Sequence, residues 1–299
     1  MNKTNFGITF LSKLGNIKPI GFNNLSIKDL FIFFKSSIKN SNYTIKSSAI
    51  AFDFFLAIFP AIIFLITLLP IIPIPNFQNI LLSEIKVIIP INAYQLFEIT
   101  LHNLINQKYY GLLSVGIILS IYYSSNALNT LIDILNNSHL IEKEHKTFKK
   151  RLLAIALFFK FSILIISIVI LSFSAEKIIH FINPNNENTL ITFIFIFIKW
   201  ILTFYFLILA ISLIFRYAQS DKLKIKFINA GTLATVIVII LSTLSLSYFF
   251  ENFSNYNKIY GSIGGLLITL IWIRICCFIT VVGFDLYMKV GTNYKGNLN

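Results

Sequence analysis

Charge is scarce in this sequence. Only 12% of its 299 residues are Asp, Glu, Lys or Arg, whereas 56% are hydrophobic, and the mean hydropathy is +0.78. Charged residues make up about a quarter of an average soluble protein. The shortage of charge therefore argues against an ordinary water-soluble domain and predicts a membrane protein.

Acidic residues are scarcer still, with 12 Asp and Glu against 25 Lys and Arg, which leaves a net charge of +13. A basic balance of this size has two interpretations. The cations bind nucleic acid, or they lie in loops on one side of a membrane and set the orientation of the chain. The placement of the cations described below favours the second interpretation, so no nucleic-acid partner is predicted.

Residues suited to catalysis and metal binding are also few. Cys276 and Cys277 are the only cysteines, and they are adjacent in an apolar stretch, so we interpret them as small apolar side chains. A metal-dependent hydrolase needs clustered ligands, and the predicted topology divides the four histidines between the two sides of the membrane. G-x-S-x-G, HExxH and glycine-rich phosphate-binding motifs do not occur. We therefore predict no enzyme activity, no metal and no cofactor.

Long hydrophobic runs are what the sequence has instead. A transmembrane helix needs about 20 apolar residues, and six windows satisfy that requirement. The windows are approximately Ser47–Leu69, Gly111–Leu131, Leu152–Phe173, Leu190–Phe215, Ile228–Phe250 and Tyr260–Tyr287. Backbone exposed to lipid must satisfy its own hydrogen bonds, so these windows are expected to be helices. We predict an all-α polytopic membrane protein with six transmembrane helices in one bundle.

The distribution of lysine and arginine predicts the orientation. Most of them lie before the first window, between windows two and three, between windows four and five, or in the C-terminal tail. The opposite side carries only Lys86, Lys108, Lys177 and Lys258. By the positive-inside rule both termini are expected to be cytoplasmic. The predicted division is a cytoplasmic segment 1–46 without a cleavable signal peptide, a membrane domain 47–287 and a cytoplasmic tail 288–299.

Two regions outside the windows are expected to be helical. The stretch SIKDLFIFFKSSIKN places apolar and basic residues on different helical faces, and Ser26 followed by Asp29 is typical of a helix start. A basic amphipathic helix of this kind normally lies in the membrane interface. Between the first two windows, Asn76 and Asn92 can each cap a short helix, so two outer-face helices are predicted to cover the bundle or to gate a cavity.

Five ionisable residues fall inside the windows, where a charge costs about 2.5–3.5 kcal/mol on insertion scales. They are Asp53, Lys160, Lys199, Arg274 and Asp285. Such residues line a polar path or are accommodated near the ends of the helices, where long side chains reach the headgroups. Asp53 and Lys160 lie at similar predicted depth, which suggests an ion pair, the alternative being that each is hydrated separately.

Arg274 is the hardest of the five to place, because it lies far from both ends of its window. Its planar guanidinium can hold a phosphate or carboxylate through two parallel hydrogen bonds. The alternative is an arginine that bonds helix carbonyls or an acidic residue of the same bundle. Asp285 follows 11 residues later, close to three full turns, so both side chains are expected on one face of the last helix.

Three separated motifs resemble the YihY/virulence factor BrkB family of bacterial inner-membrane proteins, formerly mislabelled ribonuclease BN. The first window contains Ala51, Phe52 and Pro60, and the second ends in a similar way with Ser125, Ala127, Leu128 and Asn129. The last contains the Tyr-Gly, Trp and Gly-x-acid pattern as Tyr260, Gly261, Trp272, Gly283 and Asp285. Asp285 stands where the family usually has Glu.

The resemblance implies a six-helix inner-membrane protein with a transport role in the envelope, for lipid or lipid-linked molecules. Two hypotheses follow. In the first, the chain translocates a lipid or another anionic envelope component and Arg274 holds its headgroup. In the second, the chain is a non-transporting scaffold for envelope assembly, and its internal charges are structural pairs. The first requires a cavity that reaches one side of the membrane, whereas the second requires a filled bundle.

Overall fold

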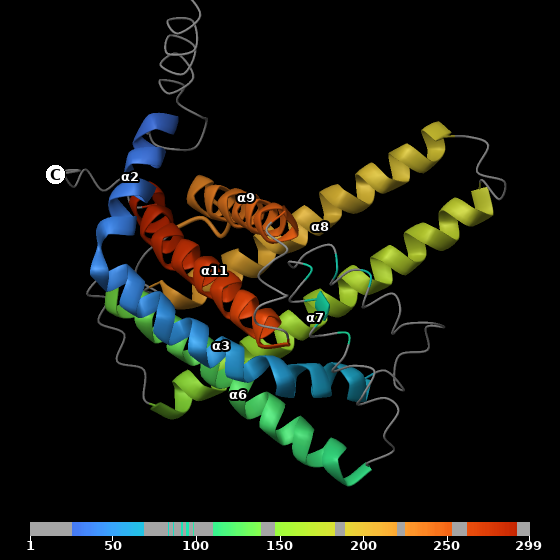
Figure 1. Ribbon diagram of the computed structural model, residues 1–299, viewed down its shortest axis with the longest axis horizontal. Helices are drawn as coiled ribbons and strands as arrows, with labels where there is room; N and C mark the ends of the chain where they lie inside the picture. The colour runs from blue at the N-terminus through green and yellow to red at the C-terminus, as the bar shows by residue number, and fades with distance from the viewer. Residues whose placement is uncertain are drawn as a thin grey trace, which may run out of the picture.

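A computed structural model describes residues 26–68, 110–138, 147–182, 189–219, 225–252 and 262–291, together with the isolated positions 83, 86, 91, 94, 95 and 98. These segments form helices and contain no strand, as predicted (Figure 1). The helices are α2 (Ile27–Lys39), α3 (Ser41–Leu68), α6 (Tyr110–Ser138), α7 (Thr147–Ile182), α8 (Thr189–Ala218), α9 (Ala230–Asn252) and α11 (Ser262–Gly291).

Helix α2 starts where its sequence predicts. The Ser26 hydroxyl accepts a hydrogen bond from the Asp29 backbone N–H at 3.2 Å, and the Asp29 carboxylate accepts one from the Ser26 backbone N–H at 2.9 Å. This reciprocal capping box satisfies two donors that would otherwise lack a partner at the helix terminus. The predicted helix start is therefore confirmed.

Four of the described helices contain a stretch that is long and apolar enough to cross a membrane. These stretches are Lys150–Ile168, Phe193–Ala218, Ala230–Phe250 and Gly264–Gly291. Helices α3 and α6 have 28 and 29 residues, so each is about 40 Å long at a rise of about 1.5 Å per residue. The chain is thus a helical membrane protein, and the six-span arrangement stays a prediction. The two predicted outer-face helices lie outside the described residues, apart from the isolated positions.

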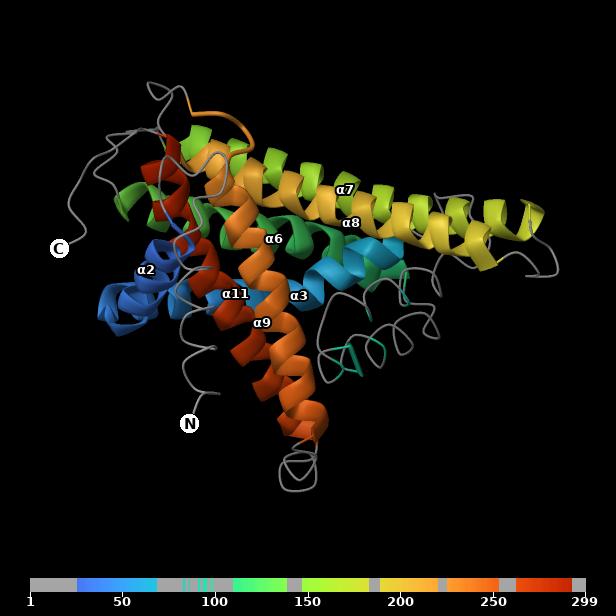
Figure 2. The same cartoon turned by 90° about the horizontal axis from the view of Figure 1, so that it is seen from above.

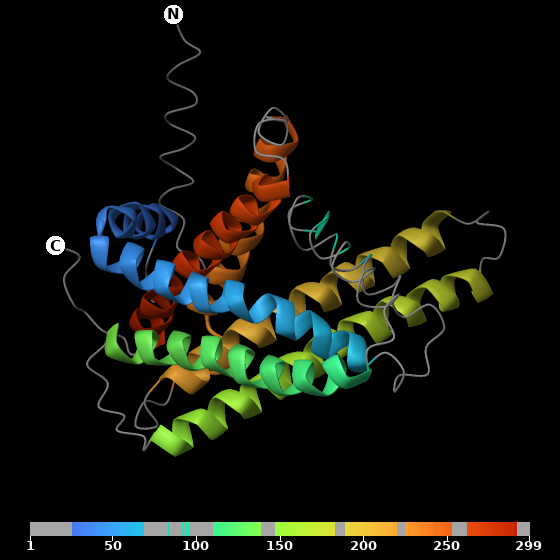
Figure 3. The same ribbon diagram turned by 60° about the horizontal axis from the view of Figure 1, so that its bottom comes forward.

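The helices form two antiparallel hairpins that diverge from one another. Helices α7 and α8 run side by side in one direction, and α9 and α11 run side by side in another (Figures 2 and 3). Helices α3 and α6 pack together, and α11 packs against α3 on one side and α9 on the other. The predicted cytoplasmic ends of the helices gather, while their other ends spread apart (Figure 2).

The core surrounds the carboxyl-terminal half of α11. Val281, Phe284 and Tyr287 are fully buried there, against apolar side chains of α3, α6 and α8. A helix that is apolar on all sides is expected to be enclosed by its neighbours. The first half of α8 is the opposite case, because Leu190, Phe193 and most of the side chains that follow are exposed. In a membrane, such a surface faces hydrocarbon.

Two glycines allow α9 and α11 to approach closely. A Cβ added to Gly231 would lie 2.5 Å from the Tyr287 Cα, and one added to Gly283 would overlap the Thr235 side chain. Asn229 caps α9 by accepting from the Thr232 backbone N–H at 3.1 Å, and its amide donates to the Tyr287 carbonyl at 3.0 Å. The close approach fixes the register of the two helices and thereby the groove described next.

Candidate functional site

A groove of about 1010 Å³ lies between α2, α3, α9 and α11. A smaller cavity of about 360 Å³ lies next to it and shares Val238, Leu241, Ser242 and Ile275 with it. We refer to the two together as the α9–α11 groove. Its lining is Leu30, Phe34, Ile38, Thr44, Ser47, Ala234, Ile237, Val238, Leu241, Ser242, Ser245, Leu246, Phe249, Ile271, Arg274, Ile275, Phe278 and Ile279.

The lining follows from ordinary helix periodicity. Ile271, Arg274, Ile275 and Phe278 recur on one face of α11, because positions three and four apart are neighbours on a helix. The stripe Leu30, Phe34 and Ile38 of α2 covers the groove from the other side. This stripe belongs to the apolar face that the sequence of α2 predicts.

Arg274 is the only charged residue in this lining. Its side chain is exposed to the groove, and among the described residues it has no hydrogen bond or ion pair. The other polar side chains of the lining are hydroxyls, those of Thr44, Ser47, Ser242 and Ser245. The alternative in which Arg274 bonds a helix carbonyl or an acid of the bundle is therefore not seen within the described part of the chain.

The register of α9 against α11 places Arg274 halfway along the groove. Gly283 lies opposite Thr235, and the Trp272 indole N–H donates to the Thr243 hydroxyl at 3.1 Å. Arg274 is therefore level with Ser242, where the two cavities meet. The groove extends along α9 from Ala234 to Phe249, so about 12 Å of apolar lining lies on either side of the guanidinium.

Asp285 lies near the carboxyl end of α11. It is buried and accepts a hydrogen bond from the hydroxyl of Tyr43, near the start of α3. The Tyr43 ring also meets the edge of Phe278, a groove residue, at 6.5 Å between ring centroids. Burial, and then the neighbouring carboxylate, raise the pKa of Tyr43 well above its ordinary value, so this hydroxyl remains a donor.

The other three predicted residues lie elsewhere and do not gather at the groove. Asp53 accepts a hydrogen bond from the Thr130 hydroxyl of α6 at 2.6 Å. Lys160 donates to the Tyr217 hydroxyl of α8, and its ammonium lies 4.8 Å from the centre of that ring. The predicted Asp53–Lys160 ion pair is therefore wrong. Lys199 is on α8, outside the groove lining.

Among the described residues, no three His, Cys, Asp or Glu side chains come close enough to hold a metal ion. Cys276 and Cys277 are free thiols on α11, the second of them packed in the core. They behave as the small apolar residues that their position in the sequence suggests.

Comparison with known families agrees with this architecture. The profile of the family described as virulence factor BrkB matches residues 36–297. The chain belongs to the BrkB family. One BrkB-type relative, the ribonuclease-like protein YfkH of Bacillus subtilis (strain 168), is 29% identical over 253 residues, which cover 82% of this chain and 91% of YfkH.

A second relative is more distant. The UPF0761 membrane protein MS0032 of Mannheimia succiniciproducens is 27% identical over 95 residues, about a third of each chain. This relative is named as a membrane protein. No solved structure matches the chain.

Several residues of the BrkB-type motif have structural roles. Ala51 is buried where α3 meets α11, and Trp272 and Gly283 hold α11 against α9. Phe52 is mostly exposed on α3, and Pro60 lies inside the same helix. Tyr260 and Gly261 lie outside the described residues.

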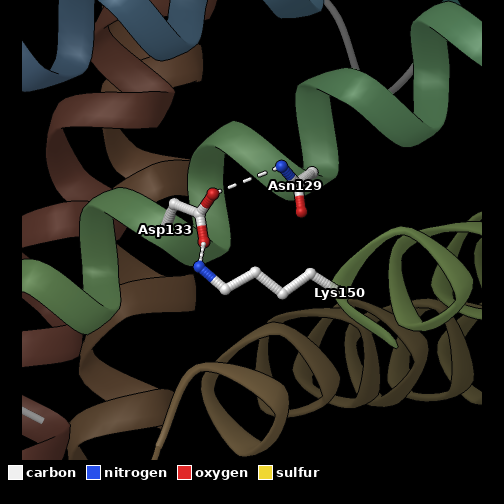
Figure 4. A network of polar contacts seen from close by, with 3 residues as sticks. All are labelled: Asn129, Asp133 and Lys150. Atoms are coloured by element: carbon white, nitrogen blue, oxygen red, sulfur yellow. Dashed lines mark hydrogen bonds and ion pairs between the residues drawn. The ribbon is translucent and has the colours of Figure 1, made fainter. Parts of the chain in front are cut away.

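Asn129, the last BrkB-type residue of α6, takes part in a polar network with α7 (Figure 4). Its amide donates to one oxygen of Asp133 at 3.2 Å, and the Lys150 ammonium donates to the other at 3.1 Å. One turn away, the Arg151 guanidinium donates to the Asn126 amide oxygen and to the Tyr122 carbonyl. The polar face of α6 thus fixes the start of α7.

Removing this network is expected to have a small effect on stability. A double-mutant cycle with Asp133→Asn and Lys150→Met should give a coupling of less than about 1 kcal/mol, because both side chains are about one third exposed. Asn129→Leu should reduce the coupling further, since its amide holds the carboxylate in position. A coupling unchanged by Asn129→Leu would show that the asparagine does not orient Asp133.

Tyr43→Phe is expected to be more costly. It removes a donor from the buried Asp285 carboxylate and should lower the free energy of unfolding by about 1–3 kcal/mol. Denaturation of the purified protein in mixed detergent micelles would measure this loss. In an Asp285→Asn background the same change should cost less, because the bond is then made to a neutral amide. An equal loss of unfolding free energy in both backgrounds would show that Tyr43 does not stabilise the Asp285 carboxylate.

Tyr43 and Tyr287 are the important residues that sequence reasoning missed. The Tyr287 hydroxyl is bonded to the buried Gln219 side chain at 2.8 Å and to the Lys226 carbonyl at 3.3 Å. These contacts join segments that are far apart in the sequence. A tyrosine at a helix terminus is also a common interfacial residue in membranes, so the sequence offered no signal that either one bonds inside the protein.

Proposed function

We propose that this BrkB-family protein transports or translocates a lipid, or another anionic envelope component of amphiphilic character, along the α9–α11 groove. One observation supports the proposal above all others. Arg274 lies halfway along an apolar groove, and within the described residues it has no partner for its charge. A permanent cation at that depth is costly unless an anion meets it.

The chemistry of the lining favours an amphiphile over a water-soluble solute. A path for a polar solute is lined by polar groups along its length, whereas this groove offers one guanidinium and a few hydroxyls. A phosphate or carboxylate headgroup would pair with Arg274 through two parallel hydrogen bonds. The apolar lining on either side of Arg274 would accept hydrocarbon. A headgroup held there would be midway in its passage across the membrane.

The proposed setting is the inner membrane of a bacterium, with both termini in the cytoplasm. Its support is the concentration of lysine and arginine on one predicted side. In this orientation α2 would lie in the cytoplasmic interface, with its basic residues toward the headgroups. Its stripe of Leu30, Phe34 and Ile38 would then cover the groove where a lipid enters from the inner leaflet.

Reconstitution tests this proposal directly. The purified protein would be reconstituted into liposomes that carry a fluorescent phospholipid analogue in the leaflet protected from a membrane-impermeant quencher. After the quencher is added, the fluorescence of these liposomes should fall faster than that of empty liposomes. Arg274→Gln should return the rate to that of empty liposomes at equal protein content. Rates equal to those of empty liposomes, across several headgroups and with an imposed proton gradient, would support the scaffold function instead.

A further inference from the structure

We infer that the ligand of the α9–α11 groove is a lipid with a single phosphodiester charge, such as phosphatidylglycerol, and not one with two phosphates. The inference rests on the proposed function and narrows its substrate class. It is carried by the charge content of the groove, the position of Arg274 and the extent of the apolar lining.

Among the described residues that line the groove, the only positive charge is one guanidinium. Arg274 is the only ionisable residue among the lining side chains of both cavities. Lys35 and Lys39 of α2 and Lys46 of α3 adjoin lining residues in the sequence, but they do not line the groove themselves. On α11 the next described cation toward the carboxyl end is Lys289, four turns further along, and its ammonium lies 4.5 Å from the centre of the Phe33 ring. Lys160 is bonded to Tyr217, and Lys150 to Asp133.

A second phosphate would therefore enter the groove without a cation. A guanidinium satisfies one phosphodiester through its fork, and its charge is then compensated. Burying a further anion against isoleucine, leucine and valine incurs the full desolvation cost, and the hydroxyls of Ser242 and Ser245 offset only part of it. The groove thus selects for one negative charge. A zwitterionic lipid would bring its own ammonium, so its phosphate could pair with Arg274 only by leaving one positive charge in excess.

The dimensions of the groove indicate acyl chains. From Ala234 to Phe249 the lining follows α9 for about 22 Å, more than half the roughly 30 Å hydrocarbon core of a bilayer. The larger cavity alone, at about 1010 Å³, lies at the upper end of the range of about 300–1000 Å³ typical of small-molecule pockets. A small anion would leave most of this apolar surface bare.

Binding to the purified full-length protein tests the inference without requiring transport. Native mass spectrometry from detergent would be used to count the lipids retained after incubation with equal amounts of phosphatidylglycerol, cardiolipin and phosphatidylcholine. Cardiolipin carries two phosphodiesters, and phosphatidylcholine has no net charge. We expect phosphatidylglycerol to be retained at least about tenfold more tightly than either, a difference of one decade in dissociation constant.

Four variants locate the binding site. Arg274→Gln should abolish the preference for phosphatidylglycerol, and Arg274→Lys should keep a part of it. Lys199→Gln is the matched control, because it removes one cation from a membrane helix without touching the groove. Ser242→Trp should weaken binding of every lipid, since it fills the point where the two cavities meet.

Several results would overturn the inference. Cardiolipin retained through Arg274 as tightly as phosphatidylglycerol would show that the groove accepts two phosphates. A preference unchanged in Arg274→Gln, or lost equally in Lys199→Gln, would place the lipid elsewhere. No retained lipid and a spectrum dominated by dimers would show that a second copy of the chain covers the groove. Selective binding without translocation in liposomes would contradict the transport function alone.

Discussion

Replacing Arg274 by leucine is expected to raise the stability of the folded protein while it abolishes lipid movement. Among the described residues the guanidinium has no partner, so the leucine variant loses no bond and no longer places a charge in the membrane. The free energy of unfolding should rise by about 1 kcal/mol or more, given insertion costs of about 2.5–3.5 kcal/mol for a central charge. Unfolding in mixed detergent micelles would measure the gain.

This prediction separates a ligand-binding arginine from a structural one. An arginine that bonds carbonyls or an acid of the bundle leaves a buried partner unsatisfied when it is removed, and stability then falls. Arg274→Lys serves as the control, because it keeps the charge and should leave stability close to that of the native protein. A clear loss of stability in Arg274→Leu would show that the arginine is a structural residue.

Gly231→Ala is expected to be the most damaging single methyl addition in the described helices. The new Cβ would lie 2.5 Å from the Tyr287 Cα and 2.6 Å from its backbone nitrogen, so α9 and α11 must separate. Overpacking of this kind typically costs about 1–3 kcal/mol. Because the groove depends on the register of these two helices, lipid binding should weaken along with stability.

Gly283→Ala provides the matched comparison for that effect. Its methyl would overlap the side chain of Thr235, not a backbone, so shortening that side chain should relieve the clash. The double variant Gly283→Ala with Thr235→Ala is expected to be more stable than Gly283→Ala alone. No such rescue is available for Gly231→Ala. If Thr235→Ala gave no relief, close packing at Gly283 would not be the reason for its cost.

Much of the fold could be predicted from the sequence, because lipid imposes simple constraints. Helices were expected from the apolar windows, and four of those windows correspond to described helices that can cross a membrane. The start of α2 followed from Ser26 and Asp29. Arg274 could be singled out because a charge in a long apolar stretch is costly wherever the helix lies.

The pairing of side chains could not be predicted in the same way. Equal depth suggested that Asp53 and Lys160 would meet, but depth does not determine which face of a helix meets which neighbour. Helix α3 packs chiefly against α6 and α11, so Asp53 reaches Thr130, while Lys160 lies beside α8 and bonds Tyr217. Such contacts depend on helix rotation, which apolar composition leaves open.

The groove itself was expected to be more polar than it is. All five ionisable residues were candidates for one path, yet only Arg274 lines the groove, and Asp285 is held by Tyr43 behind Phe278. The reason is that the carboxylates of Asp53 and Asp285 accept hydrogen bonds from hydroxyl groups on neighbouring helices. The lone arginine in an apolar groove narrows the expected ligand from a lipid or another anionic envelope component to an amphiphile.

A structure of the protein in lipid nanodiscs that contain phosphatidylglycerol would test the central claim most directly. Cryo-electron microscopy should show elongated density in the groove between α2, α9 and α11, with its headgroup against Arg274 and its chains along Ile237, Leu241 and Phe249. An Arg274 side chain bonded to a protein carboxylate, in a groove closed by side chains, would contradict the account.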